Sequence, residues 1–305
     1  MNTSSLYNSA QTQQLLGGLS GNIAALNAYF QAIMAVPLRE RQVGRTLFGE
    51  PILWDPTGGN YGLLGQMEQA QQQAPGFHQS VVVGWADFQA SLVAALGTTQ
   101  QPGIVNQLTI IVNELKQPGA AANLPAITHA LQQVQNSVQQ LSGQASSLQQ
   151  ATAALVAAMP QQLDALSQLQ STVINSLQKL RTQSIIIESM GRLGAFGAAL
   201  EGNPVQGATL YFEQEQPQLN NARAAGQPAL QALSNLQDLL AGQHNYYADV
   251  LQKLTVADSN LALVQLALAS FDAQLALLYW QDLSRFLASH NLTSPAEQAP
   301  LPPPM

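Results

Sequence analysis

Apolar residues recur every three or four positions along most of this 305-residue chain, which predicts amphipathic helices. The first predicted helix runs from Leu15 to Val36, and two shorter, strongly apolar helices are expected at Ser80–Gly97 and Gly103–Gly119. The predicted core residues of the first helix are Ile23, Leu26, Phe30 and Ile33. The stretch Pro37–Gly62 is rich in turn formers and is expected to be an irregular connection.

The most regular pattern begins at Leu124, where apolar residues alternate spacings of four and three. Its positions are Ile127, Leu131, Val134, Val138, Leu141, Ala145, Leu148, Thr152, Leu155 and Met159. After Pro160 the pattern resumes at Leu163, Leu166, Leu169, Val173, Leu177 and Leu180. Such a heptad seam is typical of long helices that pack side by side. Pro160 either kinks this helix or ends it, because proline lacks the backbone N–H that a helix interior needs.

A second long seam is predicted in the C-terminal part of the chain. Its positions are Val250, Leu254, Ala257, Leu261, Val264, Leu268, Phe271, Leu275 and Leu278, preceded by Leu230, Leu233, Leu236 and Leu240. Gly242 is the expected weak point of this arm, at a place that matches Pro160 in the first arm. Two antiparallel long helices, each kinked or broken once, account for the match.

These patterns predict an all-α fold, an elongated bundle of four to five long helices with a small hydrophobic head inserted between two of them. The head is either a β-hairpin or a set of short helices. The expected organisation is N-terminal rod helices at 1–183, the head at 184–217, C-terminal rod helices at 218–291 and a disordered Pro-rich tail at 292–305. The irregular connection then covers residues 37–62.

The head lacks a clean helical period and is apolar and rich in glycine. The residues expected to enter a membrane are Ile185, Ile186, Ile187, Leu193, Phe196, Leu200, Val205, Leu210, Tyr211 and Phe212. The expected hinge residues are Gly191, Gly194, Gly197, Gly202 and Gly207. The isoleucine run and the run that ends at Phe212 are composed of β-prone residues. One interpretation is an ordinary helix–helix connection with its own small core, but such connections need only about 2–8 residues. The other is a lipid-seeking head.

Composition narrows the choice of partners. Charged residues make up only 9% of the chain, the net charge is −7, and no basic run is present. These features exclude nucleic acid as an expected partner, and any membrane affinity has to be hydrophobic. The chain has no cysteine, which removes disulfides, thiol catalysis and zinc–thiolate sites.

No catalytic or cofactor motif is evident, so we expect no enzyme activity, no cofactor and no metal site. The four histidines have no metal-ligand spacing, and His129 is expected at the surface. The sequence "WDPTGG" at 54–59 is interpreted as a turn stabilised by Asp55 and Pro56. The apolar stretch Leu261–Trp280 is long enough to span a bilayer, but its heptad spacing favours the core of a bundle.

Taken together, the charge-poor long helices, the head two-thirds along the chain and the aromatic-ended C-terminal seam resemble the α-helical pore-forming toxins. That superfamily includes cytolysin A, haemolysin BL and the non-haemolytic enterotoxin. The resemblance implies a soluble bundle whose head inserts into a target-cell lipid membrane, with assembly into a homo-oligomer or with a second or third protein component. Haemolytic or insecticidal activity and secretion follow as expectations. The N-terminus lacks the features of a signal peptide, so another route of release is expected.

Glu188, Arg192 and Glu201 make this head less hydrophobic than the strongest members of that superfamily. An amphipathic hairpin that lines water, or a component that needs a partner, would suit these charges. The alternative function is a non-toxic coiled-coil scaffold, such as a structural protein of a secretion apparatus, a phage or an adhesion system.

Overall fold

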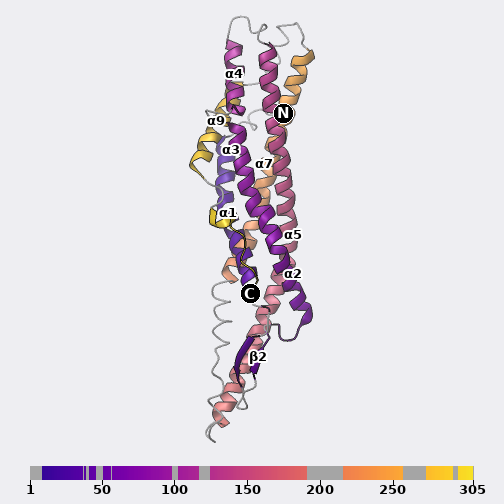
Figure 1. Ribbon diagram of the computed structural model, residues 1–305, viewed down its shortest axis with the longest axis vertical. Helices are drawn as coiled ribbons and strands as arrows, with labels where there is room; N and C mark the ends of the chain where they lie inside the picture. The colour runs from indigo at the N-terminus through magenta and orange to yellow at the C-terminus, as the bar shows by residue number, and fades with distance from the viewer. Residues whose placement is uncertain are drawn as a thin grey trace. The chain divides into compact units, whose positions relative to one another are not determined.

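The computed structural model describes residues 9–36, 38, 41–45, 51–55, 57–97, 102–116, 124–190, 216–256, 273–290 and 295–304. In chain order the elements are α1 (Ser9–Ala35), β1 (Arg41–Arg45), β2 (Pro51–Trp54), α2 (Tyr61–Phe77), the π-helix η2 (His78–Val83), α3 (Gly84–Leu96), α4 (Ile104–Lys116), α5 (Leu124–Met190), α7 (Gln216–Val256), α9 (Ala273–Ser289) and α10 (Pro295–Gln298) (Figure 1). Helices thus dominate the described residues, which confirms the all-α prediction.

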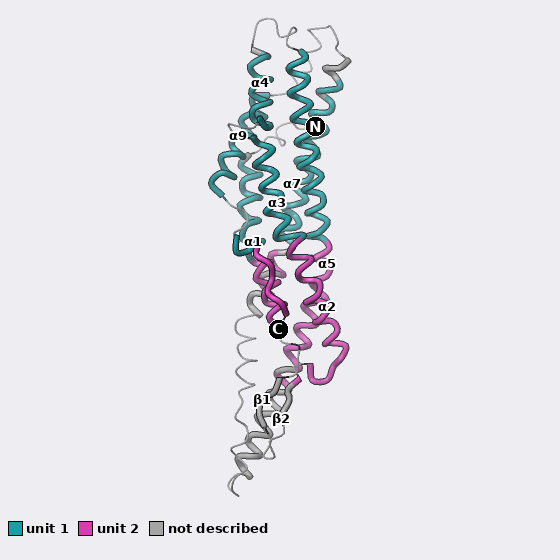
Figure 2. The backbone as a smooth tube through the Cα atoms, viewed as in Figure 1, with its two compact units in different colours: residues 1–24, 80–153, 227–298 teal, residues 25–79, 154–226, 299–305 magenta. Residues whose placement is uncertain are grey.

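The chain divides into two compact units, and neither is continuous in sequence (Figure 2). Unit 1 contains residues 1–24, 80–153 and 227–298, and unit 2 contains residues 25–79, 154–226 and 299–305. Within unit 1, α3, α4 and α9 pack against one another. Both units draw on α5, which contributes its first part to unit 1 and the remainder to unit 2.

The heptad seam predicted for α5 is confirmed. Every predicted position from Ile127 to Met159 is buried, and so are Leu163, Leu166 and Leu169 beyond Pro160. Polar and small residues such as Gln139, Gly143 and Gln150 occupy the exposed face of the same helix. Burial of apolar seam residues supplies the main stabilising free energy, at about 1.5–3 kcal/mol for each fully buried large side chain.

The prediction for the other arm is wrong at the end that the structure describes. Leu275 and Leu278, the last two positions of that seam, are 48% and 53% exposed. The residues of α9 that are buried are Ala273, Ala276, Tyr279, Trp280, Leu283 and Leu287. The buried face therefore lies one residue further along the helix, where the two large aromatic rings pack edge to face at 5.2 Å. Upstream, Leu233, Leu236 and Leu240 of α7 are buried as predicted, while positions 257–272 lie outside the described residues.

Neither long helix ends at its predicted weak point. α5 continues through Pro160, and α7 continues through both Pro228 and Gly242. Pro160 is exposed, so the carbonyl group that loses its N–H partner lies on the side of the helix where water can replace it. The alternative in which Pro160 ends its helix is therefore wrong, because water can replace the lost hydrogen bond, and a kink at Pro160 stays a prediction.

Three further differences concern local structure. Part of the stretch predicted as irregular, 37–62, forms an antiparallel pair in which Arg41 faces Trp54 and Arg45 faces Pro51. Helix α2, which precedes the predicted Ser80–Gly97 helix, was not anticipated and continues into it through η2. The tail predicted as disordered contains the one-turn helix α10.

Candidate functional site

The predicted head falls mostly outside the described residues. Leu193, Phe196, Leu200, Val205, Leu210, Tyr211 and Phe212 lie there, as do the predicted hinge residues Gly191, Gly194, Gly197, Gly202 and Gly207. The exception is the isoleucine run Ile185–Ile187, which belongs to the last turns of α5. These β-prone residues are helical in the structure, where α5 continues to Met190. The head is thus bounded by two long described helices, and α7 resumes the chain at Gln216.

The turn predicted at "WDPTGG" is confirmed for Asp55, while Pro56 lies outside the described residues. The Asp55 carboxylate accepts hydrogen bonds from the Thr57 N–H, the Thr57 hydroxyl and the Gly59 N–H, each at 2.7 Å. Gly58 and Gly59 have φ values of 60° and 80°, which glycine adopts without strain. Partial burial acts to raise the pKa of Asp55, but these hydrogen bonds prevail and lower it. The carboxylate therefore serves the turn that leads into α2.

Two buried tyrosine hydroxyl groups, one in each unit, pair with polar side chains. In unit 2 the Tyr29 hydroxyl donates to Gln162 Oε1. In unit 1 the Thr12 and Tyr279 hydroxyl oxygens lie 3.1 Å apart. Burial raises the pKa of Tyr279 to about 12, although the hydrogen bond with Thr12 opposes the rise. These pairs join residues far apart in sequence. Because each tyrosine is buried and stays neutral, we interpret its hydrogen bond as part of the packed core.

The histidines do not gather into a metal site, and no group of three or more potential metal ligands occurs among the described residues. His129 is exposed as predicted, and His290 is exposed at the end of α9. His78 is buried, with its ring edge-on to Phe30 at 6.1 Å.

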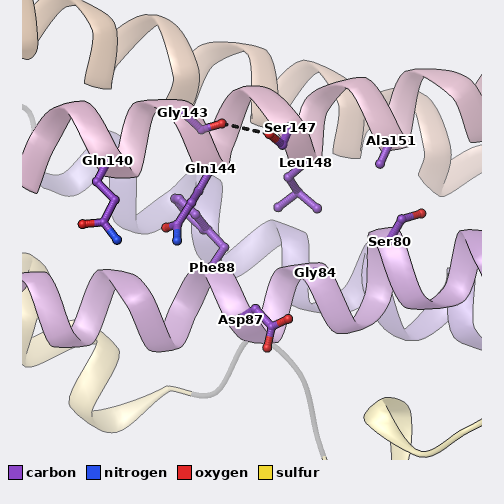
Figure 3. A pocket seen from close by; sticks show the side chains of 10 residues that line it. All are labelled: Ser80, Gly84, Asp87, Phe88, Gln140, Gly143, Gln144, Ser147, Leu148 and Ala151. Carbon is purple, nitrogen blue, oxygen red and sulfur yellow. Dashed lines mark hydrogen bonds between the residues drawn. The ribbon is translucent and has the colours of Figure 1, made fainter.

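A groove of about 620 Å³ lies within unit 1 between α3 and α5 (Figure 3). Its apolar floor contains Phe88 and Leu148, whose side chains are only 3% and 5% exposed. In the close-up, Gln140, Gln144 and Leu148 point from α5 toward α3, whereas Asp87 points away from them. The remaining lining residues are small: Ser80, Gly84, Gly143, Ser147 and Ala151.

Polar groups in the groove are neutral amides and hydroxyls apart from Asp87. Gln144 Nε2 donates to the Ser91 hydroxyl at 3.1 Å, while its Oε1 atom is buried and has no hydrogen-bond partner. A Cβ atom added at Gly143 would meet nothing within 4 Å. The hydrophobic patterns of the sequence did not predict this groove. Its signal was the small residues at intervals of four, at 80 and 84 and again at 143, 147 and 151.

Among the described residues, no helix combines the length and the apolar character that crossing a bilayer requires. The predicted candidate Leu261–Trp280 is described only from Ala273 onward, where it forms part of α9.

No protein-family model matches the chain, and no curated protein matches it in sequence. Among solved structures, the chain is similar to the crystal structure of Motility Associated Killing Factor B from Vibrio cholerae. That match covers 92% of each chain at 12% sequence identity, with a TM-score of 0.43.

Proposed function

We propose that this protein is a membrane-active toxin, or one component of a multi-part toxin, whose segment 191–215 enters a target membrane together with Ile185–Ile187. One observation carries the proposal. The two longest described helices, α5 with 67 residues and α7 with 41, are joined by this apolar, glycine-rich segment. A connection between bundle helices needs only about 2–8 residues, so the rest of the segment has another task.

Apolar burial favours insertion. Burial of about 600 Å² of apolar surface contributes about 15 kcal/mol at about 25 cal/mol per Å². The charged residues of the segment oppose insertion, because a charge at the bilayer centre costs about 3 kcal/mol on insertion scales. They are Arg192, Glu201, Glu213 and Glu215, with Glu188 next to the isoleucine run. Insertion is favourable when these charges face water or a partner component, and we therefore include assembly with a second protein or a second copy in the proposal.

The test is dye release from liposomes and flotation with them, by the purified protein alone and with the products of neighbouring genes of similar size. We expect Phe196→Glu combined with Leu200→Glu to abolish release while the helical circular dichroism signal and the thermal midpoint stay unchanged. The matched control places the same charges on exposed leucines of α9, as Leu275→Glu with Leu278→Glu, and should retain release.

Two results would overturn the proposal. One is the absence of release and flotation under every combination of components. The other is a Phe196→Glu/Leu200→Glu protein that loses its folded bundle, because that outcome is expected of a scaffold in which the segment is a packed structural connection.

A further inference from the structure

We infer that the proline-rich segment 299–304 is a docking site for a protein domain whose aromatic groove binds the polyproline II conformation. The surface and the kind of partner differ from those of the proposed function. The inference depends neither on segment 191–215 nor on lipid.

The backbone of this segment is restricted before any partner binds. Its sequence is "APLPPP", so every residue in it is either a proline or precedes one. The proline ring fixes φ near about −65°, and a residue before proline is disfavoured in the helical region. These restrictions favour polyproline II, and residues 300–304 form neither helix nor strand in the structure. Binding in this conformation therefore costs little backbone entropy.

The proline rings of the segment are open to solvent, whereas Leu301 is partly buried. The exposed residues are Pro300, Pro302, Pro303 and Pro304. A polyproline II helix has about three residues per turn, so Pro300 and Pro303 share one edge and Pro302 lies on another. Leu301 lies on the third edge together with Pro304. The two edges without Leu301 are therefore the ones available to a partner.

This surface differs from the rest of the described surface in how its apolar groups are distributed. The six large apolar side chains that are exposed among the described residues are spread over α2, α3, α4, α5 and α9. In the proline-rich segment, four apolar rings are exposed within five successive positions. Contiguous exposed apolar surface commonly marks an interaction site.

The absence of charge indicates what kind of groove fits the segment. Residues 298–305 contain no Asp, Glu, Lys or Arg, and the nearest charged residue is Glu297. An ion pair with these residues is therefore excluded as the basis of recognition. The segment offers proline rings, which pack on aromatic faces, and solvated carbonyl groups, which accept hydrogen bonds from Trp N–H and Tyr O–H groups. Such aromatic-lined grooves occur in SH3, WW and EVH1 domains.

The test is isothermal titration calorimetry of the full chain with a purified SH3 domain, a WW domain and an EVH1 domain, each with established affinity for polyproline. We expect at least one of them to bind the wild type. Pro300→Ala combined with Pro303→Ala removes both rings of one edge and should raise the dissociation constant at least about tenfold. Because both prolines are exposed, the thermal midpoint of the chain should stay unchanged.

Two control variants have matched substitutions. Pro295→Ala alters an exposed proline of α10, outside the proline-rich segment, and should bind as the wild type does. Leu301→Ala alters the edge that is partly buried in the free protein, and it should also retain binding. Added salt should leave the dissociation constant unchanged, because no ion pair contributes to recognition.

The absence of binding to all three domains would overturn the inference, as would equal binding by the wild type and Pro300→Ala/Pro303→Ala. Binding that Pro295→Ala also abolishes, or that weakens with salt, would locate the contact elsewhere and overturn it too. If no domain bound and Pro300→Ala/Pro303→Ala weakened flotation with phosphatidylcholine vesicles, the ligand would be lipid and the inference wrong. Phe196→Glu/Leu200→Glu should leave domain binding unchanged, so the two proposals fail separately.

Discussion

At the residue scale, two glycines of unit 1 have opposite reasons for being glycine. Gly103 lies beside the backbone that ends α3, and a Cβ atom on it would come within 2.5 Å of the Ala95 carbonyl oxygen. Gly143 lies in the interior of α5 and faces open space. The first glycine is required by a close backbone approach, and the second is not required by the folding of a single chain.

Alanine at these two positions should therefore change stability in opposite directions. We expect Gly103→Ala to lower the free energy of unfolding by about 1–3 kcal/mol, because the backbone must shift to admit the methyl group. Gly143→Ala should raise it by about 0.5–1 kcal/mol through helix propensity. Urea unfolding followed by circular dichroism measures both. Destabilisation by Gly143→Ala would mean that the groove is occupied within the chain.

Tyr279 makes a second residue-scale prediction, about alkaline pH. Its pKa is raised by burial from 10.0 to about 12, so the folded state holds its proton more tightly than the unfolded state does. Stability from this group is complete below pH 10 and is lost as the pH rises toward 12. The loss amounts to about 2–3 kcal/mol.

Tyr279→Phe should make unfolding less sensitive to pH in this range, as measured by urea midpoints at successive pH values. Tyr29 is also buried, and its pKa is raised as well, so part of the alkaline loss should persist in the variant. An unchanged slope in Tyr279→Phe would show that this hydroxyl ionises as readily in the folded state as in the unfolded state.

At the scale of the element, α5 and α9 show where a hydrophobic pattern determines the buried face and where it does not. In α5 the seam is the continuous apolar stripe, and most of the remaining positions are glutamine, serine, asparagine and alanine. One face could be buried, and it is. In α9 the sequence "LALLYW" places apolar residues on more than one side of the helix. Two stripes with heptad spacing then compete, and the one that carries Tyr279 and Trp280 is buried.

Two leucines of α9 allow a test of which stripe is buried. Leu283 is 2% exposed and Leu278 is 53% exposed, on the same helix. We expect Leu283→Ala to cost about 2–5 kcal/mol of unfolding free energy, because it leaves a cavity in the core of unit 1. Leu278→Ala should stay within about 0.5 kcal/mol of the wild type. Equal losses would show that the stripe predicted from sequence is buried as well.

Some features of the fold could be predicted from local sequence patterns, and others could not. Helix α1, the seam of α5 and the turn at Asp55 were predictable because each depends on local spacing or on side chains near in sequence. The β1–β2 pair and the groove depend on which segments meet in space. The continuity of α5 through Pro160 depends on which side of the helix faces water. Local spacing does not determine which segments meet in space, and the small residues at intervals of four gave only an indirect sign of the groove. The α5 seam did place Pro160 off the buried face, so that part of the outcome followed from the pattern.

At the scale of the whole molecule, the scarcity of charge predicts how the protein selects a membrane. Ten lysines and arginines are outnumbered by seventeen aspartates and glutamates, and the sequence has no polybasic run. Polybasic segments gain about 1 kcal/mol per basic residue at an anionic membrane surface, and this chain forgoes that attraction. If residues 191–215 enter lipid, apolar burial alone must provide the binding free energy.

We therefore expect binding to vesicles of neutral phosphatidylcholine to equal or exceed binding to vesicles that contain phosphatidylserine. Salt should leave binding to neutral vesicles unchanged, because screening affects interactions between charges and leaves the hydrophobic contribution in place. Flotation at low and high ionic strength measures this, with Phe196→Glu/Leu200→Glu as the variant that lacks apolar burial. Binding that requires anionic lipid and weakens as salt is added would contradict this prediction, because it would show that basic side chains make the contact. One of these, Arg285, forms an ion pair with Asp282 at 2.9 Å. If binding is hydrophobic, vesicles with looser lipid packing should bind more protein at every salt concentration, because apolar side chains enter them at a lower free-energy cost.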